Sequence, residues 1–231
     1  MKRILRLIEG ARESLPANPL FVLLSDEDVD GHDRLSWAPA MLYYLMGFKD
    51  VLGALARTRP ESDLDRKINA YCIEDAEHWR WYLEDLEKLG FSIESWGADV
   101  PALCNEVWSE ALKPNRATIF SLIHYARLAT DPLLALTLIQ IFEATGVVFI
   151  GHTRKAAIAA GMDDTLKYFG RVHYEEEFSH TVQSQDLEDY SLSAESMRTA
   201  EAAVRELFVL FDEMFSAWHA HRGRYPTKRD I

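Results

Sequence analysis

Apolar side chains recur along nearly the whole chain with the three-to-four-residue spacing of an amphipathic helix. Near the N-terminus, Ile4, Leu5 and Ile8 follow this spacing and predict a helix over residues 2–14. A last helix is expected over about 194–222. Its apolar positions match a core-facing stripe: Ala203, Leu207, Leu210, Phe211, Met214 and Trp218. The pattern therefore predicts an all-α protein.

Further helices are expected between these two ends. They cover about 34–57, 61–89, 101–112, 115–130 and 131–161, followed by the stretch around 170–181. The segment 61–89 has the clearest boundaries, with Ser62 and Asp63 at its start and Gly90 after its end. No linker, repeat or low-complexity segment interrupts the chain. We therefore expect one domain, residues 1–231, with about seven to nine helices.

Charge and cysteine content narrow the functional classes. The net charge of −12 argues against binding nucleic acid, which needs clustered Lys and Arg. The two cysteines, Cys72 and Cys104, are too few for a disulfide framework and lack Cys-x-x-Cys spacing. This cysteine content favours a reducing compartment. Charged residues interrupt the N-terminal apolar positions before a signal-type run can form. The expectation is a cytoplasmic protein that does not bind a membrane.

The stretch from Pro132 to Gly151 is almost entirely apolar and carries one charge, Glu143. Its length approaches that of a membrane span, but a lone run is more simply the central helix of a bundle. A buried carboxylate has to be neutral, paired or bound to a metal. Arg127 and Arg154 are possible partners, and a metal is the preferred interpretation.

The clearest chemical pattern lies in the segment Gly170 to Thr181. His173, Glu177 and His180 stand at i, i+4 and i+7, which places them on one stripe of a helix. Two imidazoles with a carboxylate between them suit a divalent transition metal, iron above all. A solvated acidic helix that happens to carry two histidines is the alternative, and Glu176 is a possible alternative ligand.

A second acid-x-x-His spacing lies in the helix expected over 61–89. Asp75 precedes His78 by three residues, as Glu177 precedes His180, and Glu74 lies one turn before His78. Pairs of this kind project inward in carboxylate-bridged di-metal bundles. The simpler interpretation is an acidic helix face with a half-buried histidine. Asp75 is the preferred earlier carboxylate, and Glu74 is the alternative.

With these residues placed, the chain resembles the haem-oxygenase-like helical superfamily, and in particular its non-haem di-iron oxidases and oxygenases. Relatives of these proteins include TenA-type thiaminase II and pyrroloquinoline quinone synthase. Three segments carry the resemblance, 74–81, the lone Glu143 and 166–180, and it extends over about 30–220. Several members have a Glu seven residues before the His that corresponds to His78, and this chain has Tyr71 at that position.

The resemblance implies a haem-oxygenase-like helical bundle and a set of metal ligands, with two iron ions, Fe(II) or Fe(III), per chain. The implied ligands are Asp75, His78, Glu143, His173, Glu177 and His180. If no earlier carboxylate replaces the Glu missing at Tyr71, the second iron is weakly held or the site is mononuclear. Thiaminase, haem-binding and ferritin-like chemistries match these residues less well.

The function implied is that of an iron oxidoreductase that activates O2 and oxidises a small organic substrate, such as a carboxylic or amino acid. Residues expected to line the substrate pocket are Tyr43, Tyr44, Met46, Trp79, Tyr168 and Phe169. The rival interpretation is a non-enzymatic ligand-binding or interaction bundle whose acids and histidines are structural. The oligomeric state stays open, with a homodimer as one option.

Overall fold

The computed structural model describes residues 1–97, 99–177 and 187–227, with only the backbone of Glu177. Helices make up all the regular structure in these ranges, which confirms the all-α prediction. The α-helices are α1 (Lys2–Arg12), α2 (Pro19–Ser25), α3 (Gly31–Arg34), α4 (Leu42–Leu55), α5 (Asp63–Asp75), α6 (His78–Lys88), α7 (Val100–Val107), α8 (Lys113–Leu128), α9 (Pro132–Ala159), α10 (Arg171–Glu177) and α11 (Ala194–Ala220). Short 3-10 turns are Leu15–Ala17, Ala38–Met41 and Ile93–Trp96.

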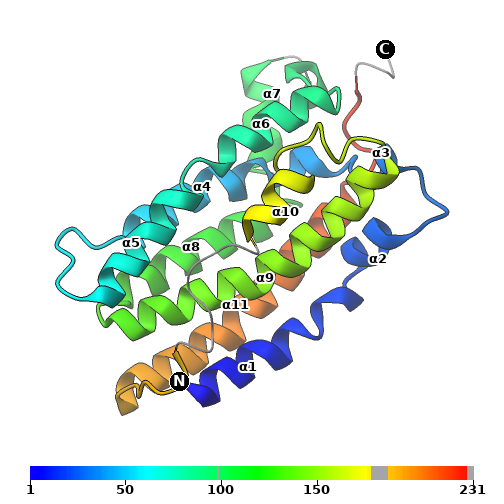
Figure 1. Cartoon of the computed structure of the whole chain (residues 1–231). Coiled ribbons are helices and arrows are strands. Elements are labelled where there is room, and N and C mark those ends of the chain that lie inside the picture. Colours follow the sequence, from blue (N-terminus) through cyan, green and yellow to red (C-terminus); the bar gives the residue numbers. More distant parts are fainter. Residues whose placement is uncertain (98, 178–186, 228–231) are drawn as a thin grey trace.

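Helix α9 lies at the centre of the bundle. It starts at Pro132, after the Asp131 side chain caps it by accepting a hydrogen bond from the Leu133 N–H. It packs against α1, α2, α3, α5, α10 and α11 (Figure 1). By length and composition alone α9 could cross a membrane, but 67% of its most apolar window is buried within this bundle. That burial is typical of a core helix.

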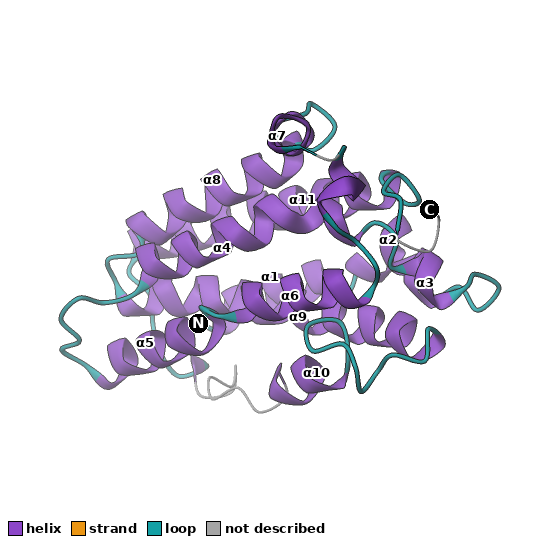
Figure 2. Cartoon of the chain, turned by 90° about the horizontal axis from the view of Figure 1, so that it is seen from above, coloured by secondary structure: helices purple, strands orange, loops and turns teal. Residues whose placement is uncertain are grey.

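The other helices lie on two sides of the bundle. In the view from above, α4 and α8 lie toward one side, and α5 and α10 toward the other (Figure 2). Helix α4 packs tightly on α8, and α11 packs on both α8 and α9. Helices α5, α9 and α10 thus come together on one side, where the acid and histidine motifs are found.

Two helices predicted as continuous are interrupted. The segment expected as a helix over 34–57 begins at the last residue of α3, passes through the turn Ala38–Met41 and becomes α-helical only in α4. Pro39 lacks the N–H that a continuing helix needs. The segment expected over 61–89 divides into α5 and α6, and Ala76 and Glu77 lie between them. This second interruption falls between Asp75 and His78, so the two residues lie on different helices.

A buried polar side chain fixes the segment before α4. Asn115 on α8 donates a hydrogen bond from Nδ2 to the Ala40 carbonyl at 2.7 Å. Its Oδ1 accepts one from Trp218 Nε1, also at 2.7 Å. Trp218 in turn stacks on Trp37, with ring centroids 5.4 Å apart and an interplanar angle of 6°. Asn115 therefore joins α8, α11 and the turn before α4.

We expect Asn115→Leu to lower the free energy of unfolding by about 2–4 kcal/mol, because it leaves the Ala40 carbonyl and the Trp218 indole N–H buried without partners. Chemical denaturation monitored by circular dichroism measures the change. Asn105→Leu, at an exposed position of α7, is the matched control and should change the stability by less than about 0.5 kcal/mol. Equal effects of the two variants would contradict the role given to Asn115.

Candidate metal centre

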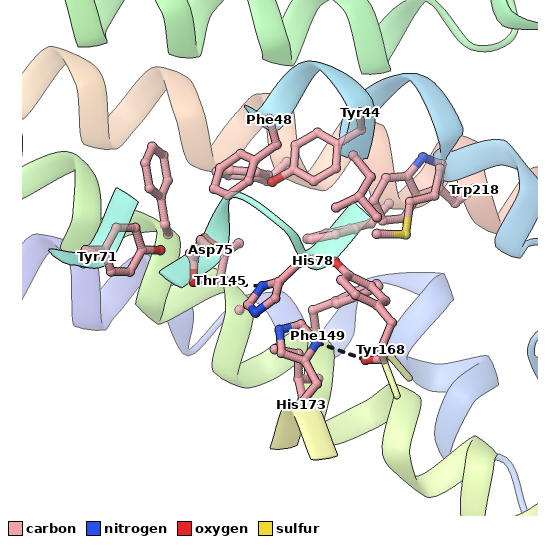
Figure 3. Close-up of a pocket in the computed structure, with 17 residues that line it drawn as sticks. Tyr44, Phe48, Tyr71, Asp75, His78, Thr145, Phe149, Tyr168, His173 and Trp218 are labelled. Carbon is pink, nitrogen blue, oxygen red and sulfur yellow. Dashed lines mark hydrogen bonds and ion pairs between the residues drawn. The ribbon is translucent and has the colours of Figure 1, made fainter. Parts of the chain in front are cut away.

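Two histidines from different helices face each other in the interior. His78 begins α6 and His173 lies on α10. Their ring centroids are 4.5 Å apart with an interplanar angle of 62° (Figure 3). The side chains are 7% and 3% exposed, respectively. The structure thus brings together two of the predicted site residues, His78 and His173.

The orientation of His173 is fixed by the backbone. Its Nδ1 lies 2.9 Å from the carbonyl oxygen of Tyr168. A carbonyl only accepts hydrogen bonds, so Nδ1 must carry the proton and donate it. The other nitrogen, Nε2, then keeps its lone pair, as a metal-binding imidazole requires. Trp81 packs beside both rings, with its centroid 4.8 Å from that of His78 and 6.0 Å from that of His173.

Two carboxylates lie next to His78. Asp75 Oδ1 is 3.8 Å from His78 Nδ1, and Glu176 Oε2 is 3.9 Å from His78 Nε2. Asp75 is 8% exposed, whereas Glu74 is exposed to solvent. The position of Asp75 favours it over Glu74 as the earlier carboxylate. Glu176, expected only as an alternative ligand, proves to lie close to the histidine pair.

A cavity of about 80 Å³ adjoins Asp75, His78 and His173. One water molecule needs roughly 10–15 Å³ of such space, so the cavity has room for a small ligand. The walls are mostly apolar and aromatic, and they include Tyr44, Phe48, Tyr71, Phe149, Tyr168 and Trp218 (Figure 3). Asp75, His78 and His173 thus form a polar corner of a mostly apolar cavity.

Tyr44 brings a hydroxyl group to this cavity. Burial, and in addition the negative charge of Asp75, raise the pKa of Tyr44 well above its usual value. The hydroxyl therefore stays protonated at neutral pH and can donate a hydrogen bond. Burial and the same carboxylate also raise the pKa of the Cys72 thiol, to about 12. A thiol in that state is a poor nucleophile.

The expected pocket residues divide into two groups. Tyr44 and Tyr168 line the cavity, as predicted. The other four lie elsewhere. Met46 is 44% exposed, and Tyr43 packs its ring against Trp108. Trp79 lies under the side chains of Lys49 and Arg80, and Phe169 is buried against Trp37 and Tyr82. These four residues therefore do not line this cavity.

Glu143 lies away from the cavity walls. It is half-buried on α9 and lines a surface groove beside α1, together with Lys2, Arg6 and Arg12. The predicted convergence of Glu143 with the histidines is thus not seen among the described side chains. Neither proposed arginine partner is supported. Arg154 bonds to Asp163 at 3.0 and 3.2 Å, and Arg127 is exposed on α8. Packing of α1 on α9 was not foreseen from the sequence.

Two predicted ligands cannot be placed. The side chain of Glu177 and all of His180 lie outside the described residues. Within the part of the chain that is described, no three His, Cys, Asp or Glu side chains are arranged to hold a metal ion. The described residues therefore bring the ligand types together without completing a coordination sphere.

Phe48, Tyr71, Phe149 and Trp218 line the cavity but were not predicted to do so. Phe149 and Trp218 follow the apolar stripes of α9 and α11, where a sequence pattern cannot separate cavity wall from solid core. Tyr71 carried a signal, because it shares the face of α5 with Asp75 one turn later.

Comparison with models of known protein families gives no match. Comparison with curated proteins gives no match either. The functional assignment therefore depends on the residues and geometry of this chain.

Proposed function

We propose that this chain is a non-haem iron oxidoreductase that uses O2 to oxidise a small organic substrate. One observation carries the proposal: two buried imidazoles from separate helices, 4.5 Å between ring centroids, meet at the corner of an apolar cavity. Two carboxylates accompany them within 4 Å of His78. A merely structural histidine pair would not need a cavity at its side.

The donor set fits iron. Imidazole nitrogens combined with carboxylate oxygens are the ligands that non-haem iron uses. Asp75, His78, His173 and Glu176 would hold the first ion, and the Nδ1–H of His173 already points to a backbone carbonyl, as metal-bound histidines commonly do. Glu143, Glu177 and His180 are the ligands proposed for a second ion.

Bound iron supplies the electron transfer to O2 that no amino-acid side chain can provide. The protein supplies the surroundings. Phe48, Phe149 and Trp218 would hold the apolar part of the substrate and exclude water from the cavity. Tyr44, which stays protonated, would donate a hydrogen bond to a polar group of the substrate. Thr145 and Gly146 on α9 also line the cavity. Because Thr145 is small and Gly146 has no side chain, these two residues leave room for such a molecule.

The decisive experiment measures metal content and O2 use. Protein purified under anaerobic, iron-replete conditions should retain up to two iron ions per chain. The loaded protein should then consume O2 in the presence of one member of a panel of small carboxylic acids, amino acids and apolar alcohols. Protein that keeps no iron above the level of a heat-treated control would refute the proposal.

A second function is favoured by the aromatic cavity walls, namely binding of an apolar ligand without metal. Calorimetric titration of the metal-free protein with small apolar compounds tests it. Binding that is the same with and without ferrous iron would support this alternative, and binding only with iron would support the oxidoreductase.

Glu143 gives a separate prediction. Its neighbour one turn on, Gly146, lines the cavity and has no side chain, so a rotated Glu143 carboxylate could reach that side of α9. We expect Glu143→Leu to keep the metal-free stability within about 1 kcal/mol, because Glu143 is only half-buried at a surface groove, where substitutions usually have small effects. Bound iron should fall from two ions to one, measured by elemental analysis.

Glu9→Gln is the matched control for this measurement, because Glu9 lines the same groove beside α1. It should keep both ions. If Glu143→Leu also keeps both, Glu143 belongs to the groove and not to the metal centre.

A further inference from the structure

Asp85 on α6 is a fully buried carboxylate, with 0% of its side chain exposed. It accepts three backbone hydrogen bonds from one loop. Oδ1 accepts from the Lys167 N–H at 2.8 Å, and Oδ2 accepts from Tyr168 at 2.7 Å and Phe169 at 3.1 Å. Lys88 Nζ lies 3.5 Å from Oδ1. One side chain therefore fixes three successive peptide units.

The same peptide units hold His173. The Lys167 carbonyl accepts a hydrogen bond from the His173 backbone N–H at 3.1 Å. The Tyr168 carbonyl accepts one from His173 Nδ1 at 2.9 Å. A continuous chain of hydrogen bonds therefore leads from Asp85, through the loop 167–169, to the imidazole ring. Its two ends lie on α6 and α10.

We propose that Asp85 is a positioning residue for His173: it fixes the loop so that the Tyr168 carbonyl selects the Nδ1–H tautomer and leaves Nε2 as the ligand atom. The selection of the tautomer is independent of any metal. Only the description of Nε2 as a ligand rests on the proposed function.

The chemistry of the contact requires a carboxylate. Two oxygens accept three N–H donors, and both oxygens are used. An asparagine amide has one accepting oxygen and one NH2 group, which would face a backbone N–H and repel it. Asp85→Asn therefore releases at least one of the three peptide units, and the carbonyl of Tyr168 loses its fixed direction.

The test is the ¹⁵N spectrum of the His173 ring in metal-free protein, where protonated and unprotonated ring nitrogens have well-separated shifts. Wild-type protein should show a protonated Nδ1 and an unprotonated Nε2. In Asp85→Asn both signals should move toward intermediate positions, as expected for a mixture of tautomers. Amide hydrogen exchange of residues 167–169 should become faster in the same variant.

Asp65→Asn is the matched control. Asp65 is also a buried carboxylate that accepts three hydrogen bonds, from Glu61 and Ser62 at the start of α5. It lies ten residues, about 15 Å along the helix, from Asp75. A general loss of stability would affect both variants, but only Asp85→Asn should move the His173 signals. Unchanged His173 signals in folded Asp85→Asn would overturn the proposal.

Asp85→Glu provides the second variant should Asp85→Asn fail to fold. It keeps the carboxylate but displaces it by one methylene, so it should shift the His173 signals by less, and no shift at all would again overturn the proposal. Ferrous titration forms a separate arm, in which Asp85→Asn should weaken binding about 10–100-fold. Tautomer mixing in a protein whose wild type binds no iron would refute the proposed function and leave the role of Asp85 intact.

Discussion

Ferrous iron should bind His173→Gln at least about 100-fold more weakly than the wild-type protein. Loss of an outer partner of a metal ligand already weakens binding about 10–100-fold, and loss of the ligand itself should cost more. Glutamine is chosen because it is similar in size to histidine and is polar but uncharged. The metal-free variant should therefore stay folded. Anaerobic isothermal titration gives the affinity, and thermal unfolding gives the stability.

His78→Gln should behave in the same way, because both imidazoles face the same corner of the cavity. His124→Gln, at an exposed position of α8, is the control and should bind iron like the wild type. Wild-type affinity in both of the buried variants would mean that iron, if it binds, does so elsewhere. Loss of iron binding in His173→Gln alone would indicate that α10 supplies a ligand and that α6 does not.

Gly170→Ala should lower the free energy of unfolding by about 3 kcal/mol, at the upper end of what added atoms cost in a well-packed site. A Cβ at residue 170 would lie 2.3 Å from the Leu166 carbonyl oxygen and 2.4 Å from that of Asp163. Both neighbours are backbone atoms, so the whole loop before α10 has to move. His173 then loses its place, and iron binding should fall along with stability.

Gly151→Ala is the control for this effect. A Cβ there meets nothing within 4 Å, and Gly151 lies within α9. Alanine in a helix is favoured over glycine by about 0.5–1 kcal/mol, so this variant should be slightly more stable. Denaturant titration shows whether each variant is less or more stable than the wild-type protein. A Gly170→Ala protein as stable as the wild type would show that the loop is not confined in this way.

The sequence was sufficient for the helical class, because apolar side chains recur at helical spacing along nearly the whole chain. It also singled out Asp75, His78 and His173, which lie close together although Asp75 and His78 belong to different helices. It was insufficient for the interruption between α5 and α6. The two residues at the interruption are Ala76 and Glu77, and neither is a helix breaker such as Gly or Pro. No local sequence signal therefore marks the change in helix direction. Trp79, which was expected at the cavity, follows this interruption and packs against Lys49.

Long-range packing explains the rest. The groove that contains Glu143 exists because α1 lies against α9, and a contact between residues so far apart in the chain leaves no periodic trace. The contact of Asp85, by contrast, did leave a signal in the sequence pattern. It occupies an inward position of α6 between Tyr82 and Leu86, and a charged residue among buried apolar positions needs a partner. The sequence could indicate that such a partner exists, but not that it is the loop before α10.

The stacked indoles of Trp37 and Trp218 provide a spectroscopic probe of the cavity. They are the two fully buried tryptophans among six, and Trp218 forms part of the cavity wall. Parallel rings at this separation couple their electronic transitions, and the fixed asymmetric packing gives such a pair a strong near-ultraviolet circular dichroism signal. A molecule that enters the cavity contacts Trp218, and this contact should change the signal. Occupancy can therefore be followed by light absorption alone, without a label and without knowing in advance what the occupant is.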